Sequence, residues 1–149
     1  MKDDKTTTTT TPSAETRPAT AHFYVSDAMH HGVLTCSRDA SLARVAELMA
    51  THRVHCVVVT DDGQDGGSLW GLVSDLDLVA AASVRDLEHQ SAGATAATKA
   101  LTISPKVTLR RAAQLMTEHG TAHLVVVDPE RRPVGILSTL DVATALSKH

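Results

Sequence analysis

Two seven-residue segments carry the residue types best suited to chemistry: the pattern Gly-x-x-Ser-x-x-Asp occurs at 71–77 and again at 135–141. The glycine lets a ligand or a neighbouring backbone approach a strand end closely. A serine at the start of a helix lies beside free N–H groups, which suit a phosphate. An aspartate one turn further on shares that face and can accept hydrogen bonds from two sugar hydroxyls. The predicted contacts are therefore Ser74 and Ser138 for a phosphate or ribose, and Asp77 and Asp141 for a ribose.

The same pattern also describes a helix cap. In a capping box the serine accepts a hydrogen bond from a backbone N–H of the first turn, and the acidic side chain reaches back to the serine N–H. Such a cap stabilises a helix with no ligand present. A duplicated cap is as easy to explain as a duplicated site, so the sequence leaves both interpretations open. The two roles are compatible, because a cap can hold the carboxylate until a ribose arrives.

The signature closes a longer repeat. One copy runs from 34–37 through apolar positions at helical spacing to an unbroken apolar run at 56–59, and the other repeats this from 101–104 to 124–127. Each copy predicts a strand, a helix, a buried strand, a return strand and a second helix. Self-similarity at a fixed period indicates two copies of one unit, each too small to stand alone. The predicted fold class is α/β (α+β), with two β-α-β-β-α repeats.

The boundaries follow from composition. Residues 1–21 are rich in threonine, proline and charge without periodic apolar positions, which predicts a disordered tail. We assign 22–83 to the first repeat, 84–92 to a polar linker and 93–149 to the second repeat.

Composition narrows the class of protein. The chain has 149 residues, is 42% hydrophobic and only 2% aromatic, and has a formal net charge of −3. Without stacking platforms or runs of Lys and Arg, nucleic-acid binding is not expected. The N-terminus leads into a threonine run rather than an apolar segment, and no stretch approaches the ~20 apolar residues that cross a bilayer. We therefore expect a cytoplasmic protein with no membrane partner.

Metal binding and covalent catalysis have little support. His30, His31 and Cys36, or His52, His55 and Cys56, could suggest a metal site, but neither set has a known ligand spacing. His52 and its counterpart His119 fall at helix ends, where the helix dipole favours them. No Gly-x-Ser-x-Gly elbow occurs, and neither cysteine has an evident base partner. We predict no metal, no catalytic residue and no enzyme.

At the level of the whole repeat the chain resembles a tandem pair of CBS domains, a Bateman module. The resemblance rests on the β-α-β-β-α order, the opening Leu-Thr-x-Ser, the helix ending in Leu-Met, the Val-rich second strand and the closing Gly-x-x-Ser-x-x-Asp, and it covers about residues 24–148. It implies two units related by pseudo-two-fold symmetry, with their sheets packed together and two clefts between them. It also implies adenosyl ligands such as AMP, ADP, ATP or S-adenosylmethionine, and a flat homodimer.

The resemblance adds further candidate ligand contacts to the signature residues. These are Thr35 and Thr102 at the strand openings, and the segments that enter the second strand, His55-Cys56 in one copy and Ala122-His123 in the other. The ligand would act as an effector, with no separate cofactor.

The chain departs from the family pattern at several positions. Leu76 and Leu140 stand where family members often carry Arg or Lys, and Val58 and Val125 stand where a proline is common. Asp75 places a negative charge beside Ser74, whereas Thr139 is neutral. Since one misplaced carboxylate costs on the order of 1 kcal/mol near a protein surface, we expect the cleft built on Thr102, Ser138 and Asp141 to bind nucleotides more tightly. The first cleft should be weak or suit adenosine.

Two functional hypotheses follow. The first is a regulatory module that binds an adenosyl ligand in one or both clefts and signals to an unidentified partner protein. The second is a ligand-free module that serves only dimerisation or protein interaction. Under either, we expect a homodimer through the signature helices, whose apolar residues exceed what one helix layer can hide: Leu76, Leu78, Val79, Leu140, Val142 and Leu146.

Overall fold

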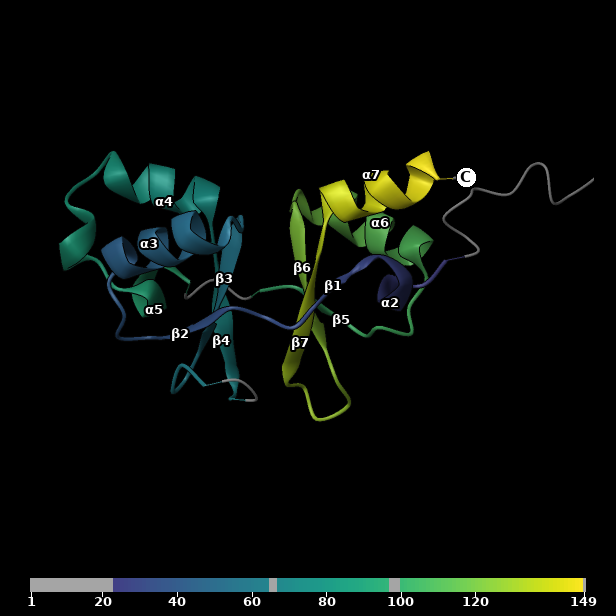
Figure 1. The fold of residues 1–149 in the computed structure, drawn as a ribbon, viewed down its shortest axis with the longest axis horizontal. Coiled ribbons are helices and arrows are strands. Elements are labelled where there is room, and N and C mark those ends of the chain that lie inside the picture. The colour runs from purple at the N-terminus through teal and green to yellow at the C-terminus, as the bar shows by residue number, and fades with distance from the viewer. Residues whose placement is uncertain (1–22, 65–66, 97–99, 149) are drawn as a thin grey trace, which may run out of the picture.

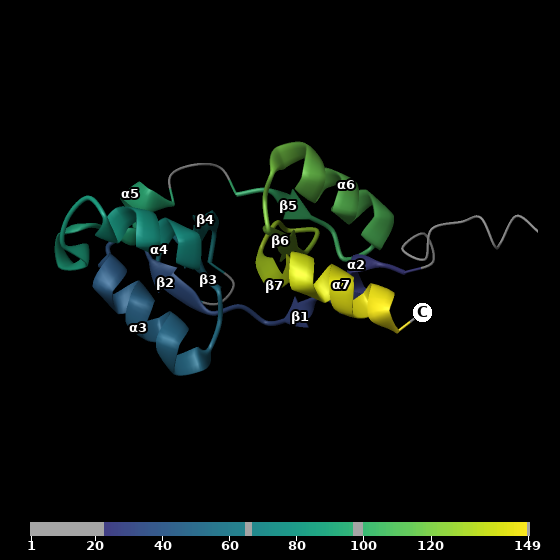
Figure 2. The same ribbon diagram turned by 90° about the horizontal axis from the view of Figure 1, so that it is seen from above.

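Two sheets stand side by side in the middle of the molecule, with helices on their outer sides (Figures 1 and 2). The computed structural model describes residues 23–64, 67–96 and 100–148. The predicted tail, 1–21, lies outside these ranges. Within them, no helix is long and apolar enough to cross a membrane.

The predicted order of elements is confirmed in both repeats. The first repeat consists of β2 (Thr35–Ser37), α3 (Leu42–His52), β3 (Cys56–Thr60), β4 (Leu69–Ser74) and α4 (Asp75–Ala82). The second consists of β5 (Thr102–Ile103), α6 (Leu109–His119), β6 (His123–Val127), β7 (Pro133–Ser138) and α7 (Thr139–Ser147). In each, the first two strands are parallel and the last two antiparallel.

Local sequence explains where the first helix of each repeat begins and ends. Ser41 caps α3 by accepting a hydrogen bond from Arg44 N at 3.1 Å, and Thr108 caps α6 through Arg111 N at 3.2 Å. Both helices end at a left-handed residue, Arg53 after α3 and Gly120 after α6. A left-handed residue stops a helix and satisfies its last carbonyl groups. The repeats thus share their capping chemistry as well as their order.

Segment 23–31 leads into β2 at the start of the first repeat but packs on the second repeat. It forms α2 (Val25–Ala28) and β1 (His30–His31). Val25 N donates to Val107 O and Leu109 N donates to Phe23 O, both at 2.8 Å. Strand β1 pairs antiparallel with β7 and completes a four-stranded sheet in the order β1-β7-β6-β5 (Figure 1). Val25 of α2 and Met29, the residue that follows α2, therefore belong to the core of the second repeat.

The converse holds for the segment that leads into β5 of the second repeat, which packs on the first repeat. It contains a 3-10 helix, η3 (Leu87–His89), and α5 (Ala92–Thr95). Leu42 N donates to Gln90 O at 2.8 Å, and Ala92 N donates to Ala40 O at 2.7 Å. Ala92 is fully buried in the core of the first repeat.

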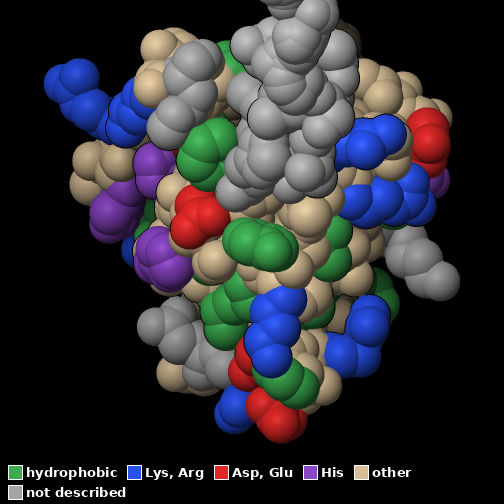
Figure 3. Space-filling model, turned by 90° about the vertical axis from the view of Figure 1, so that its right-hand side faces the viewer, with side chains coloured by type: hydrophobic (Ala, Val, Ile, Leu, Met, Phe, Trp, Pro, Cys, Tyr) green, Lys and Arg blue, Asp and Glu red, His purple; other side chains and the backbone are tan. Residues whose placement is uncertain are grey.

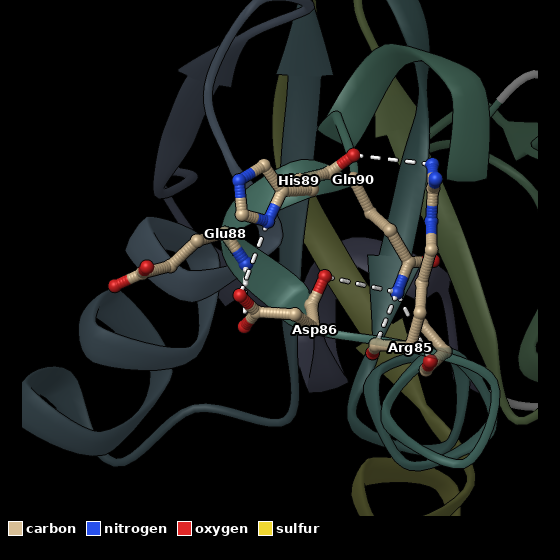
Figure 4. A network of polar contacts seen from close by, with 6 residues as sticks. Arg85, Asp86, Glu88, His89 and Gln90 are labelled. Carbon is tan, nitrogen blue, oxygen red and sulfur yellow. Dashed lines mark hydrogen bonds and ion pairs between the residues drawn. The ribbon is translucent and has the colours of Figure 1, made fainter.

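Segment 84–92, assigned from the sequence to a linker, is held by its own polar contacts (Figure 4). The Gln90 side chain donates to the carbonyl groups of Ala81 and Arg85 at 3.0 Å. His89 Nδ1 lies 3.1 Å from Asp86 Oδ2.

The glycine of each signature is required by this exchange of leading segments. A Cβ atom on Gly135 would collide with the carbonyl oxygen of His30 and the methyl group of Met29, and one on Gly71 would collide with the carbonyl oxygen of Ala96. Of the two partners that the sequence allowed for this glycine, a ligand or a neighbouring backbone, the structure shows the backbone.

Replacing Gly135 by alanine should therefore loosen the exchange. Because Met29 and the β1 backbone must both move, we expect Gly135→Ala to lower the free energy of unfolding by about 1–3 kcal/mol, as overpacking generally does. Urea denaturation measures this change. The matched control is Gly120→Asn, at a left-handed glycine whose Cβ would meet nothing within 4 Å, and it should cost only a few tenths of a kcal/mol. Equal stabilities of the two variants would contradict this account.

Candidate functional site

A cavity of about 750 Å³ lies between the two repeats. Pockets of this size bury a small molecule of a few hundred daltons. Three regions line it: the connection 30–34, the turn from α3 into β3, and the facing ends of β6, β7, α4 and α7. The lining residues are His30, His31, Gly32, Val33, Leu34, His52, Arg53, Val54, His55, Cys56, Asp75, Ala122, His123, Ile136, Ser138, Thr139 and Leu140.

The walls of the cavity combine apolar and basic side chains. Val33, Leu34, Val54 and Ile136 supply aliphatic surface, and no aromatic residue is among the described lining. Five of the lining residues are histidines. Figure 3 views the molecule from the side of the second repeat, and histidine side chains gather along the left edge of this view, next to an acidic side chain. An aliphatic wall facing ionisable groups suits a ligand with one flat apolar part and one anionic part.

The Ser-x-x-Asp pairs form capping boxes in both repeats. Ser74 Oγ accepts from Asp77 N at 3.2 Å, and Ser74 N donates to Asp77 Oδ2 at 2.8 Å. Ser138 Oγ accepts from Asp141 N at 3.1 Å, and Ser138 N donates to Asp141 Oδ2 at 2.8 Å. Each aspartate therefore uses one carboxylate oxygen for the cap and keeps the other for a further contact.

The two aspartates differ in that further contact. Asp141 is 8% exposed, and its Oδ1 lies 3.0 Å from Nε2 of His30, which β1 brings across from the other repeat. Asp77 is more exposed and has no such ion pair within the described ranges. The position that corresponds to His30 in the second copy is Ala97, which lies outside those ranges.

Asp75, within the first signature, is held in place at the cavity wall by two hydrogen bonds. Asp75 Oδ2 accepts from His55 Nδ1 at 3.0 Å, and its Oδ1 accepts from Leu76 N at 2.8 Å. The hydrogen bond from His55 is the largest of the effects that lower the pKa of the Asp75 carboxyl. Asp75 thus remains an anion at the N-terminus of α4, whereas Thr139 at the start of α7 is neutral.

Burial makes both cysteines inert. It raises the pKa of the Cys56 thiol to about 12, assisted by the nearby carboxylates of Asp75 and Asp141. Burial alone raises the pKa of the Cys36 thiol to about 11. Both thiols are therefore protonated at neutral pH and are poor nucleophiles. Among the described residues, no group of three or more His, Cys, Asp or Glu side chains is arranged to hold a metal ion.

The structure brings half of the predicted site residues to one cavity. His55, Cys56, Ala122, His123 and Ser138 line it. Five predicted residues are not among its lining residues: Thr35, Ser74, Asp77, Thr102 and Asp141. Asp141 nevertheless contacts His30, which does line the cavity.

Two of these residues have other contacts. Thr35 Oγ1 donates to the carbonyl group of Gly63 at 3.0 Å, in the loop between β3 and β4. Asp141 and His30 also line a second cavity of about 560 Å³ between α2 and α7.

Sequence reasoning did not anticipate the mixed origin of this wall. It drew each cleft from one repeat, whereas the cavity joins Ser138 of the second repeat to His55 and Cys56 of the first. The sequence indicated only metal-ligand or helix-end roles for His30, His31 and His52. The sequence signal that could have indicated this wall is the grouping of histidines just before β2 and at the end of α3.

Comparison with known proteins identifies the repeated unit. A sequence model of the CBS domain matches residues 25–84 and 93–148. The chain is 28% identical over 130 residues to a homoserine O-acetyltransferase from Methanosarcina acetivorans, covering 87% of this chain but only 23% of that protein. It is 28% identical over 120 residues to the CBS domain-containing protein YhcV from Bacillus subtilis, covering 80% of this chain and 82% of that protein.

Solved structures share the fold. The CBS domain protein PAE2072 from Pyrobaculum aerophilum, complexed with AMP, is 25% identical with a TM-score of 0.71, over 85% of this chain and 100% of that chain. CBSX2 in complex with AMP is 26% identical with a TM-score of 0.70, over 85% of this chain and 97% of that chain.

The two capping boxes should differ in their contribution to stability. Loss of a cap costs about 1 kcal/mol, which is the expected loss for Asp77→Ala. Asp141→Ala should cost about 2 kcal/mol, because it also removes the partner of His30 from a buried position. Chemical denaturation of both variants at pH 7 measures the difference. If Asp77→Ala is the more destabilising, the buried contact with His30 contributes nothing.

Proposed function

Because the chain belongs to the CBS domain family, we propose that it is a regulatory module that binds an adenosyl ligand in the cavity between its repeats. The class comprises AMP, ADP, ATP and S-adenosylmethionine. The observation that carries this proposal is the cavity itself, which has an aliphatic wall, a cluster of histidines and the N-terminus of α7 at its edge. Binding would change how the repeats pack together, and a partner protein would respond to that change. No catalytic step is part of the proposal.

The ligand's parts match different regions of the lining. The adenine would lie against Val33, Leu34 and Val54, held by aliphatic contacts and backbone groups. The phosphate would lie near Ser138 and Thr139, where the N-terminus of a nine-residue helix favours an anion. The AMP complexes of two proteins with this fold support AMP as the first ligand to test.

The ribose is proposed to reach Asp141 by displacing His30. The carboxylate oxygen of Asp141 that the cap does not use, Oδ1, lies 3.0 Å from His30 Nε2. His30 therefore occupies the place from which a sugar hydroxyl would donate. We propose that the site near Asp141 is the tighter one, since Thr139 at the start of α7 is neutral. Asp75 lines the same cavity but is already paired with His55 at 3.0 Å.

AMP should stabilise the protein, and a charge added at Thr139 should weaken that effect. At a concentration of 100 times its Kd, AMP adds about 2.7 kcal/mol to the free energy of unfolding. Thr139→Asp introduces a carboxylate within a few ångströms of the phosphate, which costs on the order of 1 kcal/mol or more, or about ten-fold in Kd. Thermal shift with AMP, ADP, ATP and S-adenosylmethionine, followed by calorimetry with AMP, measures both effects.

Thr117→Asp is the matched control, because it adds the same charge on an exposed face of α6 outside the cavity. It should bind AMP like the parent. If no adenosyl compound shifts the melting temperature, the alternative hypothesis holds, in which the fold serves only dimerisation or protein interaction. If Thr139→Asp binds AMP as tightly as the parent, the phosphate lies elsewhere.

We also propose a homodimer through α4 and α7, which lie on the same side of the molecule (Figure 1). Leu76, Val79, Leu140 and Leu146 expose 73%, 67%, 68% and 43% of their surface. The other two residues predicted for this face, Leu78 and Val142, are instead buried in the cores of their own repeats. Because the repeats present equivalent helices, a second copy can cover the face by a two-fold, self-complementary contact.

A double substitution on α4 should separate the dimer. Leu76→Glu combined with Val79→Glu places charge in the proposed interface, where unpaired buried charges are strongly unfavourable. Sedimentation velocity at micromolar protein should show a dimer for the parent and a monomer for this variant. Val84→Glu, at an equally exposed valine just beyond α4, should remain a dimer. A parent that sediments as a monomer at every concentration would contradict the proposal.

A further inference from the structure

We propose that the cavity is a proton-coupled anion site: its histidines take up protons when an anionic adenosyl ligand binds, so that affinity rises as pH falls. This inference rests on the proposed function, because it concerns the regulation of the same cavity. It would make the module respond to acidity as well as to the concentration of its ligand.

The charged and ionisable side chains of the lining couple the binding of an anion to the uptake of protons. Arg53 and Asp75 are the permanently charged side chains of the described lining, and they offset each other. The remaining ionisable bases are five histidines, contributed by β1, the end of α3, the turn before β3 and the start of β6: His30, His31, His52, His55 and His123. Histidine is the side chain whose charge changes between pH 5 and 8 without special help. Each proton taken up therefore makes the cavity more positive.

Two of these histidines have a defined place for the added proton. His55 Nδ1 lies 3.0 Å from a carboxylate oxygen of Asp75, and His52 Nδ1 lies 3.0 Å from the carbonyl oxygen of Leu48. A carboxylate and a carbonyl group only accept hydrogen bonds, so Nδ1 must be the donor in both rings. Nε2 is then the unprotonated nitrogen. Protonation there adds a charge without breaking either contact.

Carboxylate groups face two of the cavity histidines before a ligand binds. Asp75 on α4 faces His55, and Asp141 on α7 faces His30. Burial is the largest effect on His123 and lowers its pKa, while Asp75, Asp141 and Asp77 act in the opposite direction and His55 adds to the lowering. His123 is thus neutral at pH 7 in the empty cavity.

A bound anion shifts this balance. A phosphate beside His123 or His55 favours the protonated ring, as any opposite charge at close range does. Proton uptake on binding follows, and by linkage the affinity must rise as the proton concentration rises. The phosphate itself gains a proton near pH 6, so the effect should be measured between pH 6.5 and 8.0.

The cluster is not a requirement of the fold. At the positions that correspond to His30, His31 and His55, the second copy has Ala97, Thr98 and Ala122. Ala122 lies in the described part of the chain, so one repeat folds with a small residue where the other carries His55. This difference within one chain points to a role in binding rather than in packing.

Calorimetry with AMP and with adenosine, on the full chain, tests the proposal. Titrations at pH 6.5 and 8.0, in two buffers of different ionisation enthalpy, give both the Kd and the number of protons taken up. Linkage allows up to ten-fold in affinity per pH unit for each proton, and we expect AMP to bind about ten-fold more tightly at pH 6.5. Adenosine, which has no phosphate, should change by no more than about two-fold and take up no protons.

Substitution locates the protons. His55→Gln and His123→Gln should each reduce the pH dependence for AMP, and the double variant should abolish most of it. His89→Gln is the matched control: His89 has the same type of contact with a carboxylate, 3.1 Å from Asp86, but lies on η3 outside the cavity. It should retain the full pH dependence.

The outcomes separate this proposal from the one it rests on. If AMP binds equally well at pH 6.5 and 8.0 without proton uptake, the coupling is wrong and the adenosyl site stands. If the His55 and His123 variants keep the parent's pH dependence, the cavity histidines are not its source, and the proposal is again overturned. If neither AMP nor adenosine binds at either pH, the proposed function itself fails and the coupling fails with it.

Discussion

The core of each repeat is completed by the segment that leads into the first strand, β2 or β5, of the other repeat. Val25 and Met29, which come before β2 in the chain, pack with Leu109 and Leu137 of the second repeat. Ala92 and Ala96 come before β5 and pack with the buried residues of the first repeat. Because each core includes residues from a segment of the other half, the two sheets are held side by side with the cavity between them.

This exchange also explains why one signature serves two purposes. Its glycine admits the crossing backbone, and its serine and aspartate cap the helix that follows. The same crossing pairs β1 with β7, so that the histidines of β1 line one cavity with Ser138 and Thr139. The packing requirements of the fold therefore place a helix N-terminus and a basic cluster at one cavity. Any ligand chemistry is added to a signature that the fold already needs.

Sequence analysis was reliable where the signal is local. The order of strands and helices follows from hydrophobic spacing and end-capping residues, and both interpretations of Ser-x-x-Asp concern residues within one helical turn. The exchange itself was out of reach, because nothing near Val25 or Ala92 records which repeat each one packs on. For the same reason the contact between His30 and Asp141, and the joining of His55 to Ser138, could not be anticipated. The prediction that Leu78 and Val142 lie on the dimer face was wrong, because the spacing of apolar residues on a helix does not distinguish a core position from an interface position.

A crystal structure of the AMP complex at pH 6.5 tests the central claim most directly, namely that the cavity between the repeats is the ligand site. We expect AMP in that cavity, with its phosphate beside Ser138 and Thr139 and within hydrogen-bond distance of His55 or His123. The adenine should lie against the aliphatic wall at Val33 and Leu34. AMP bound on the outer face of α4 and α7, or in the cavity with its phosphate turned away from α7 and the histidines, would contradict the account.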